Sequence, residues 1–281
     1  MQWTVGRVKI TKIVEVDSTG GTRFILPQAS SEEVLKMPWL VPEFANEQGR
    51  LRMTIHSLIV ETPDHRIVVD TGLGNDKEGR HVPVWNKLNT PYLAQMTDAG
   101  YPPDTIDLVL CTHLHVDHVG WNTRLVDGRW VPTFTNARYL FGKTEYEHWA
   151  AHQHDPAHPP VSFIDSVKPV VEAGRADLIG SDHRVCEELT LIPTPGHSPG
   201  HLSILVRSDG EQMLLAGDAA HHPVQMAHLD WSSTADYDPA QATQTRRELF
   251  ARFADTPTRV IGGHFSAGRI VRDGNAFRMQ V

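Results

Sequence analysis

Four side chains of the kind that bind metal ions fall within six positions of this sequence, at His113, His115, Asp117 and His118. They follow the apolar run of residues 108–110, which is typical of a buried strand. On a helix, His113 and Asp117 would share a face while His115 pointed almost the opposite way. A strand ending in a turn can bring all four together, because side chains two residues apart project to one side and the turn brings the later pair round.

The alternative for this segment is a histidine-rich surface loop. Against it, burying so many polar groups without a ligand would cost several kcal/mol. Imidazole and carboxylate groups are ligands that zinc and its neighbours accept, and no thiolate is needed. The pattern therefore favours a metal site that the rest of the chain completes.

The segment T-H-L-H-V-D-H-V-G of residues 112–120 resembles the signature of the metallo-β-lactamase superfamily. Further motifs of that family follow in the same order over residues 50 to 270. They are V-D-T-G at 69–72, T-P-G-H at 194–197, A-G-D at 216–218 and G-G-H at 262–264. The resemblance implies an α/β fold, an αββα sandwich of two mixed sheets with helices on the outer faces.

The resemblance also implies a ligand set for two metal ions. His113, His115 and His197 would hold one ion, Asp117, His118 and His264 the second, and Asp218 would bridge them. Zinc is the default ion, and manganese, iron or cobalt would suit the same nitrogen and oxygen ligands. A water shared by two such ions would ionise near neutral pH and supply a bridging hydroxide as nucleophile.

Two positions distinguish branches of the family. The oxygen-reducing diiron branch carries Glu where this chain has His115, so a redox role is disfavoured. The acyl-homoserine lactonase branch commonly has Tyr three residues after the bridging Asp, where this chain has His221, as in the branch of the methyl parathion hydrolases. We expect His221 and Asp117 to serve as catalytic groups, with His221 as a proton donor. A solvated loop remains the alternative for His221 and for His222.

Other side chains near the motifs have simpler interpretations. Asp70 resembles the family carboxylate that orients a ligand imidazole, although an Asx turn would also explain it. Cys111 is expected to be a small core residue. Gly196 and the pair Gly262-Gly263 would let backbone pack closely beside His197 and His264.

The whole chain sets broad limits. With 281 residues, the formal net charge of −8 argues against a nucleic-acid partner, and two cysteines are too few for a disulfide framework. The first residues lack the pattern of a signal peptide, and no apolar run approaches a membrane span. We expect a cytoplasmic protein with a small-molecule substrate, no membrane contact and one domain over residues 1–281. Residues 18–50 form a long irregular excursion, expected to be a lid, a binding loop or a homodimer contact.

Periodicity predicts the regular elements. Strands are expected at 8–16, 53–60, 66–70, 107–112, 188–192, 201–207, 212–215, 259–261 and 269–272. Helices are expected at 31–36, at 91–99 with Thr90 as N-cap, at 144–153 with a Thr144/Glu147 capping box, at 162–172 with an interruption at Pro169, and at 239–253 with Asp238 as N-cap. Residues 152–160 are expected to form a loop.

The sequence thus favours a dinuclear metal hydrolase of a small neutral ester, foremost a lactone of the acyl-homoserine lactone type. A phosphotriesterase or arylesterase of the methyl parathion hydrolase type is the alternative. Thioester hydrolysis is weaker because the chain has no basic C-terminal cluster, and RNA cleavage conflicts with the net charge. A non-catalytic metal-dependent binding module is the alternative from another class. Aromatic side chains that could wall an apolar pocket are Trp39, Phe44, Trp85, Trp121, Trp149, Trp231 and Phe265.

Overall fold

The chain divides into two compact units, each with its own sheet and its own hydrophobic core. The structure is a computed structural model that describes residues 1–154 and 160–281. One unit comprises Met1–Glu15 and Ile55–Gly180, and the other comprises Val16–Thr54 and Ser181–Val281. The expected loop at 152–160 falls partly on residues 155–159, outside the described residues. That residues 1–281 form one domain stays a prediction.

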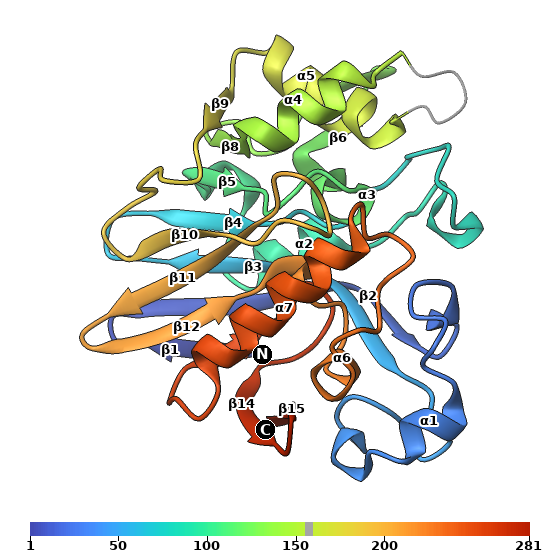
Figure 1. The fold of residues 1–281 in the computed structure, drawn as a ribbon. Coiled ribbons are helices and arrows are strands. Elements are labelled where there is room, and N and C mark those ends of the chain that lie inside the picture. Colours follow the sequence, from blue (N-terminus) through green and yellow to red (C-terminus); the bar gives the residue numbers. More distant parts are fainter. Residues whose placement is uncertain (155–159) are drawn as a thin grey trace. The chain divides into compact units, whose positions relative to one another are not determined.

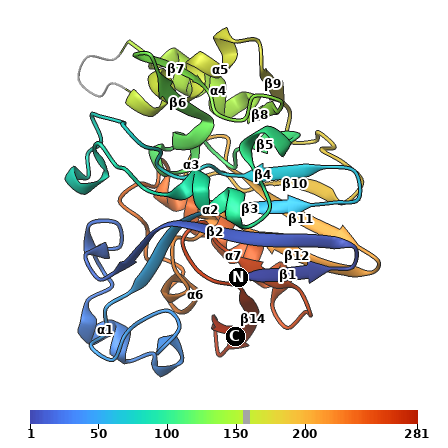
Figure 2. The same cartoon turned by 180° about the vertical axis from the view of Figure 1, so that it is seen from behind.

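The first unit is built on a mixed seven-stranded sheet, whose first strands are blue in Figures 1 and 2. In spatial order its strands are β1 (Gln2–Val5), β2 (Val8–Thr19), β3 (Arg52–Glu61), β4 (Arg66–Val69), β5 (Leu108–Leu110), β8 (Arg138–Gly142) and β9 (Ala176–Ile179). From β4 to β9 the neighbouring strands are parallel. The carboxyl ends of these parallel strands therefore lie along one edge of the sheet.

Helices and a hairpin complete this unit. They are η3 (Pro83–Trp85), α2 (Tyr92–Asp98), η4 (Pro103–Thr105), α3 (Val116–Val119), η5 (Gly120–Asn122), the hairpin β6 (Thr123–Val126) and β7 (Arg129–Pro132), α4 (Lys143–Ala151), the π-helix η6 (Phe163–Val167) and α5 (Lys168–Glu172). The central strands β4 and β5 contain continuous apolar runs, and successive side chains in these runs, which point to opposite faces of the sheet, are buried. Tyr139 and Phe141 of β8 pack in one core with Phe163 and Val170.

The second unit is built on a mixed six-stranded sheet. Its order is β10 (Leu189–Pro193), β11 (Leu202–Ser208), β12 (Glu211–Leu215), β13 (Arg259–Ile261), β14 (Gly268–Asp273) and β15 (Ala276–Gln280). Only β12 and β13 are parallel to each other among these pairs. A parallel pair needs a crossover connection, and the long helix α7 (Pro239–Phe253) lies within it.

Helix α7 covers this sheet and runs along β11 and β12 in Figure 1. Leu249, Phe250 and Phe253 face Leu205 and Leu214 in a single core. The excursion 18–50 adds η1 (Thr22–Phe24), α1 (Ser31–Leu35) and η2 (Pro38–Leu40), and the motif region adds η7 (Gly217–Ala219) and α6 (Val224–Ala227). Much of the excursion is core rather than lid, since its apolar side chains enter this cluster.

Most predicted elements are confirmed, and the errors are at their ends. The fold class is confirmed as α/β with two mixed sheets and helices. Asp238 caps α7 by accepting a hydrogen bond from the N–H of Gln241 (3.0 Å). Two predicted caps are wrong: α2 begins after Pro91, while Thr90 binds Glu15 instead, and α4 has no side-chain cap. The Thr90 hydroxyl has a tertiary partner and is therefore not available to the start of α2.

Several strands of the structure were not predicted from the sequence. The hairpin β6–β7, the sheet strands β8 and β9 and the last strand β15 were not predicted. Short strands of four or five residues carry too few alternations to stand out. No described helix has the length and apolar character needed to cross a membrane.

Candidate metal centre

The predicted metal motif follows β5, but its ligands do not lie on the strand. β5 ends at Leu110, and His113 and His115 belong to the irregular segment that follows. Asp117 and His118 lie on the one-turn helix α3, which replaces the predicted turn. A single helical turn winds the backbone once around its axis within about four residues, so it can bring Asp117 and His118 round as the turn was expected to do.

Asp70 follows β4, the parallel neighbour of β5, and its carboxylate ties the two strand ends together. Its Oδ1 accepts the backbone N–H of Thr112, and its Oδ2 accepts the Thr112 hydroxyl, both at 2.8 Å. The same Oδ2 is 2.8 Å from Nδ1 of His118. Asp70 adopts a φ of 56°, a left-handed conformation that Asp tolerates better than most residues. The structure thus places Asp70 where it orients a predicted ligand.

These contacts fix the tautomers of two imidazoles. A carboxylate only accepts, so His118 donates to Asp70 from Nδ1–H. The Thr112 hydroxyl already donates to Asp70, so it accepts from Nδ1 of His113, 3.0 Å away. Both neutral rings therefore carry the lone pair on Nε2, which is the atom and the form that bind a metal.

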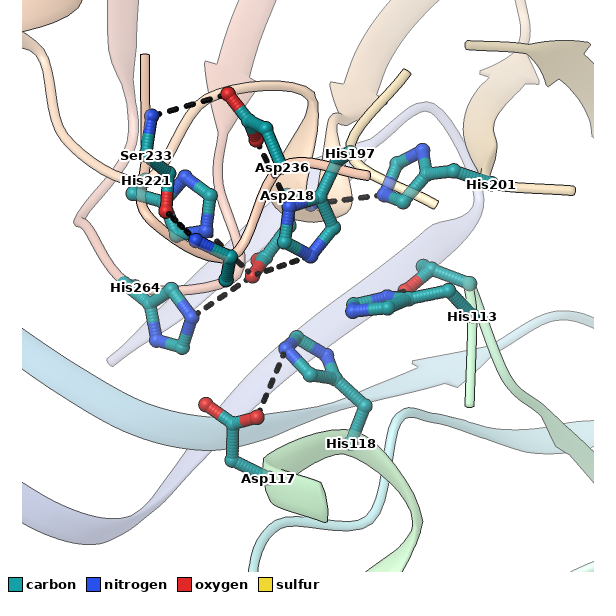
Figure 3. Close-up of polar contacts among 12 residues, drawn as sticks. His113, Asp117, His118, His197, His201, Asp218, His221, Ser233, Asp236 and His264 are labelled. Carbon is teal, nitrogen blue, oxygen red and sulfur yellow. Dashed lines mark hydrogen bonds and ion pairs between the residues drawn. The ribbon is translucent and has the colours of Figure 1, made fainter. Parts of the chain in front are cut away.

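The other two predicted ligands of this unit lie beside the first two. The ring of His115 meets the ring of His113 edge-on, with centroids 4.6 Å apart. Asp117 Oδ1 is 3.9 Å from Nε2 of His118, the contact drawn in Figure 3. Buried Glu145, which the sequence analysis did not single out, accepts the N–H of Leu114 (3.2 Å) and so holds the backbone between the two histidines of the H-x-H motif.

In the second unit the predicted ligands follow the parallel pair β12 and β13. Asp218 comes three residues after β12, and His264 comes three residues after β13. The backbones stay paired past the strands, with Gly263 N–H donating to the carbonyl of Gly217 (2.8 Å). His197 follows β10 in the segment before β11. Parallel strands end at one edge, which explains why motifs 46 residues apart in the sequence meet.

Buried Asp218 is surrounded by imidazoles of its own unit (Figure 3). Its Oδ2 is 3.0 Å from Nε2 of His264, 3.4 Å from Nε2 of His221 and 3.6 Å from Nε2 of His197. Three imidazoles around one carboxylate oxygen form a buried cluster of nitrogen and oxygen atoms of the kind that bind metal ions.

The partners of the Nδ1 atoms, which face away from Asp218, show which ring nitrogens can bind a cation. His264 Nδ1 is 3.1 Å from the carbonyl of Thr54, which can only accept, and His197 Nδ1 is 3.1 Å from Oδ1 of Asp236. Each neutral ring therefore has its N–H on Nδ1 and a lone pair on Nε2 facing Asp218. Lone pairs that face a carboxylate repel it unless a cation or an extra proton intervenes. The residues present thus fit a divalent metal ion.

His201 is a buried histidine of the same region that does not act as a ligand. Its Nε2 accepts the backbone N–H of Asp218 (2.9 Å), and its Nδ1 lies 2.7 Å from the hydroxyl of Thr194. Both nitrogens are therefore occupied by protein groups. The ring fixes the backbone of Asp218, a role that no motif in the sequence indicated.

His221 is buried rather than solvated, contrary to the loop alternative. Its Nε2 faces Asp218, and its Nδ1 has no hydrogen-bond partner among the described residues. Burial lowers the pKa of His221 to about 3, against the opposing effect of Asp218. The neutral ring is best placed as a donor from Nε2–H. Together with His197 and Asp236 it offers ligand atoms within 4.8 Å of one another.

His222 is a structural residue. Its Nε2–H donates to the carbonyl of Phe44 (2.8 Å), and its Nδ1 accepts the N–H of Val224 (3.0 Å). Burial lowers its pKa to about 4, so the ring stays neutral in both bonds. Phe44, Trp121 and Phe265, three of the aromatic residues considered for a pocket wall, are buried core residues.

Glycine is required beside His197. Gly196 has a φ of 125°, and a Cβ there would lie 2.3 Å from the backbone nitrogen of Ala242 in α7. Contact this close with backbone excludes any side chain, so the start of α7 can approach the ligand segment. Cys111 is a buried core residue, as predicted, and burial raises the pKa of its thiol.

Comparison with known proteins agrees with this arrangement. Residues 52–264 match the family model described as metallo-beta-lactamase superfamily. An N-acyl homoserine lactonase of Bacillus thuringiensis is 26% identical over 212 residues, which cover 71% of this chain and 76% of that protein.

Solved structures share the fold. The hydrolase AbOPH, of the beta lactamase superfamily, has a TM-score of 0.80 at 23% identity and covers 100% of this chain and 96% of its own. AidC, a dizinc quorum-quenching lactonase, has a TM-score of 0.76 at 19% identity and covers 99% of this chain and 96% of its own. The family match spans most of the chain and includes every motif that carries a predicted ligand. This chain belongs to the metallo-beta-lactamase superfamily and is a metal-dependent hydrolase.

Proposed function

We propose that this protein is a dinuclear metal hydrolase of small neutral esters, foremost a lactone of the acyl-homoserine lactone type. One observation carries the proposal. Buried ligand imidazoles in both units have Nδ1 held by a fixed acceptor and Nε2 left with its lone pair. Histidines that only packed in the core would have no reason to share one tautomer, with the proton on Nδ1 and the lone pair on Nε2.

The proposed ligand set is the one that the motifs imply. It comprises His113, His115, Asp117, His118, His197, Asp218 and His264. Two zinc ions held there would lower the pKa of a shared water to about 7 or below and would polarise the ester carbonyl. Manganese, iron or cobalt would suit the same donors.

The protein's own residues supply orientation and proton handling. Asp70 and Asp236 keep His118 and His197 in the tautomer that leaves Nε2 available. His221 presents an N–H to Asp218 from a buried position, and we propose it as the group that protonates a leaving alkoxide. Asp117 is proposed to share in that proton transfer.

The lactone assignment draws on the relatives and on the leaving group. An N-acyl homoserine lactonase of Bacillus thuringiensis is among the relatives, and its match covers 71% of this chain. Opening a lactone releases an alkoxide, which needs a proton from a nearby donor, and His221 could provide one. The net charge of −8 fits a neutral substrate better than a polyanion such as RNA.

A phosphotriester or aryl ester is the second candidate. His221 stands where lactonases of this family commonly have Tyr, and it is fully buried beside Asp218. A leaving group such as nitrophenolate departs without a proton, so an enzyme specialised for it would not need an acid at this position.

The test is a hydrolysis panel on protein of measured metal content. Lactones, aryl esters, phosphotriesters and thioesters are compared at equal enzyme concentration, with about two metal ions per chain expected by elemental analysis. The highest kcat/KM should be for a lactone. Fast phosphotriester cleavage without lactone activity would favour the second candidate. Full activity in metal-free protein would refute the proposal, and tight metal binding without any hydrolysis would indicate a binding module.

A further inference from the structure

Arg246 is a fully buried arginine, and it lies in the second unit behind a predicted metal ligand. It projects from the middle of α7 and its Nη1 donates to Oδ2 of Asp236 at 3.3 Å. The other oxygen of the same carboxylate, Oδ1, faces Nδ1 of His197 at 3.1 Å (Figure 3 labels both residues). Both side chains of the Arg246–Asp236 pair have no exposed surface.

Each atom of this arrangement has a fixed hydrogen-bond role. Oδ2 of Asp236 accepts from Arg246 and also from the backbone N–H of Ser233 (3.0 Å). Oδ1 is thereby directed at His197 and can only accept. Because both oxygens of the Asp236 carboxylate can only accept, Nδ1 of His197 has to be the donor. The proton of His197 is therefore confined to Nδ1.

Arg246 also fixes the loop that carries Asp236. Its Nε donates to the carbonyl of Leu229 (3.3 Å) and its Nη2 to the hydroxyl of Thr243 (3.2 Å). One guanidinium thus binds both ends of the segment 229–236. The backbone beyond it pairs with the ligand segment, since Tyr237 N–H donates to the carbonyl of His197 (3.0 Å).

A buried ion pair is an expensive way to stabilise a fold, because desolvation of the two charges offsets their attraction. Burial indeed lowers the pKa of Arg246, against the opposing effect of Asp236. A hydrophobic pair would fill the same space. A hydrophobic pair in place of Asp236 and Arg246 would, however, provide no hydrogen-bond acceptor for Nδ1 of His197.

We propose that Asp236 and Arg246 are positioning residues for His197, which lock its tautomer and aim its Nε2 at the metal. The inference rests on the metal site of the proposed function. It does not depend on which ester is the substrate. Removing a partner of this kind typically weakens metal binding by about 10- to 100-fold.

The main test is Asp236→Asn, which keeps size and shape. The amide must point its NH₂ group either at Arg246 and Ser233, which are both donors, or at Nδ1 of His197. The second choice reverses the His197 tautomer and puts a proton on Nε2. We expect one of the two metal equivalents to bind about 10- to 100-fold more weakly in competition with a chromophoric chelator, while the other equivalent is unchanged.

A double variant tests the role of Arg246. In Asp236→Asn/Arg246→Met, one of the two opposing donors is gone, so the amide can turn its oxygen to His197 more easily. Metal affinity should therefore recover in part relative to Asp236→Asn alone. A purely structural role predicts the opposite, with the double variant worse than the single one.

Asp255→Asn is the matched control, since Asp255 pairs with Arg272 in the same unit but at the surface. It should retain both metal equivalents. The ¹⁵N shifts of the His197 ring in zinc-loaded wild-type protein give a readout that needs no folded variant, and they should show a protonated Nδ1.

The outcomes separate this inference from the proposed function. Folded Asp236→Asn protein that keeps both metals at wild-type affinity, or a wild-type His197 ring protonated on Nε2, would overturn the positioning role alone. Wild-type protein that binds two metals and cleaves no ester would refute only the hydrolase. Wild-type protein that binds no metal would overturn both.

Discussion

At the scale of single residues, neighbouring histidines differ in function because their partners differ. His222 has both nitrogens bonded to backbone groups and is a structural residue, whereas His221 has one nitrogen facing Asp218 and one with no partner among the described residues. The sequence H-H at 221–222 could not distinguish them. Their partners come from Phe44 and Asp218, residues of different segments.

The residue-scale prediction concerns His221→Phe. A lactone leaves as an alkoxide and a nitrophenyl ester as a stable phenolate, so loss of a proton donor should affect the lactone most. We expect kcat for lactones to fall by about 10²-fold or more, with a much smaller change for activated aryl esters. His222→Gln is the control, because it should lower stability without changing the ratio of the two activities. An equal loss on both substrates in His221→Phe would assign the residue to binding or to metal support.

At the scale of elements, a buried charge cluster holds the segment after β4 to the π-helix η6. Lys77 has no exposed surface, donates to the hydroxyl of Thr123 (2.6 Å) and the carbonyl of Asp165 (3.1 Å), and lies over the ring of Trp130. Arg80 pairs with the carboxylate of Asp165 (3.0 Å). A π-helix is rare and its wide turn is held here by tertiary bonds rather than by propensity.

The element-scale prediction is a pH dependence. Burial lowers the pKa of Lys77 from 10.5 to about 7, although Asp165 opposes the shift. Between these values the unfolded chain binds a proton that the folded chain does not, so the free energy of unfolding rises with pH. Below about pH 7 the folded state bears the full cost of the buried ammonium. The rise should be on the order of 5 kcal/mol over the whole window, since one pKa unit corresponds to about 1.4 kcal/mol.

Urea unfolding at pH 6.5 and 9.5 measures the rise in the free energy of unfolding for the wild type and for Lys77→Met. The methionine side chain has no proton to gain or lose in this pH range. The wild type should gain stability relative to the variant at the higher pH. Lys87→Met is the matched control, because Lys87 forms an exposed pair with Glu78 close by in the sequence. It should follow the wild type at both pH values. A Lys77→Met curve parallel to that of the wild type would show that Lys77 is not desolvated.

At the scale of the whole molecule, metal binding and folding should be coupled. A ligand that binds only the folded chain stabilises it by about 2.7 kcal/mol at 100 times its Kd. We therefore expect a chelator to lower the Tm of the wild type by several °C and to abolish hydrolysis. His115→Ala and Asp218→Ala should be inactive, should contain less metal and should respond less to the chelator. Lost activity with unchanged metal content would show that their roles are misassigned.

The sequence by itself determined the family and the fold class, and it predicts the types of metal ligand. These follow from local patterns: apolar runs that predict strands, Asp238 before a helix, and motifs whose spacing reflects strand ends. The prediction was weaker at element ends, as Thr90 and Thr144 show. A hydroxyl can bond to the helix end or, as Thr90 does with Glu15, to a distant group, and only the tertiary structure selects between them.

Only the tertiary structure decided which buried polar groups support the ligands. Asp236, Arg246 and His201 lie in no motif. Asp236 contacts His197, His201 contacts Asp218, and Arg246 holds Asp236, through contacts over 10 to 39 residues. A hydrogen bond depends on distance and on which atom carries the proton, and neither is written in local sequence. The sequence therefore predicts the side chains that would bind a metal, and the fold determines the tautomer in which their imidazoles are held.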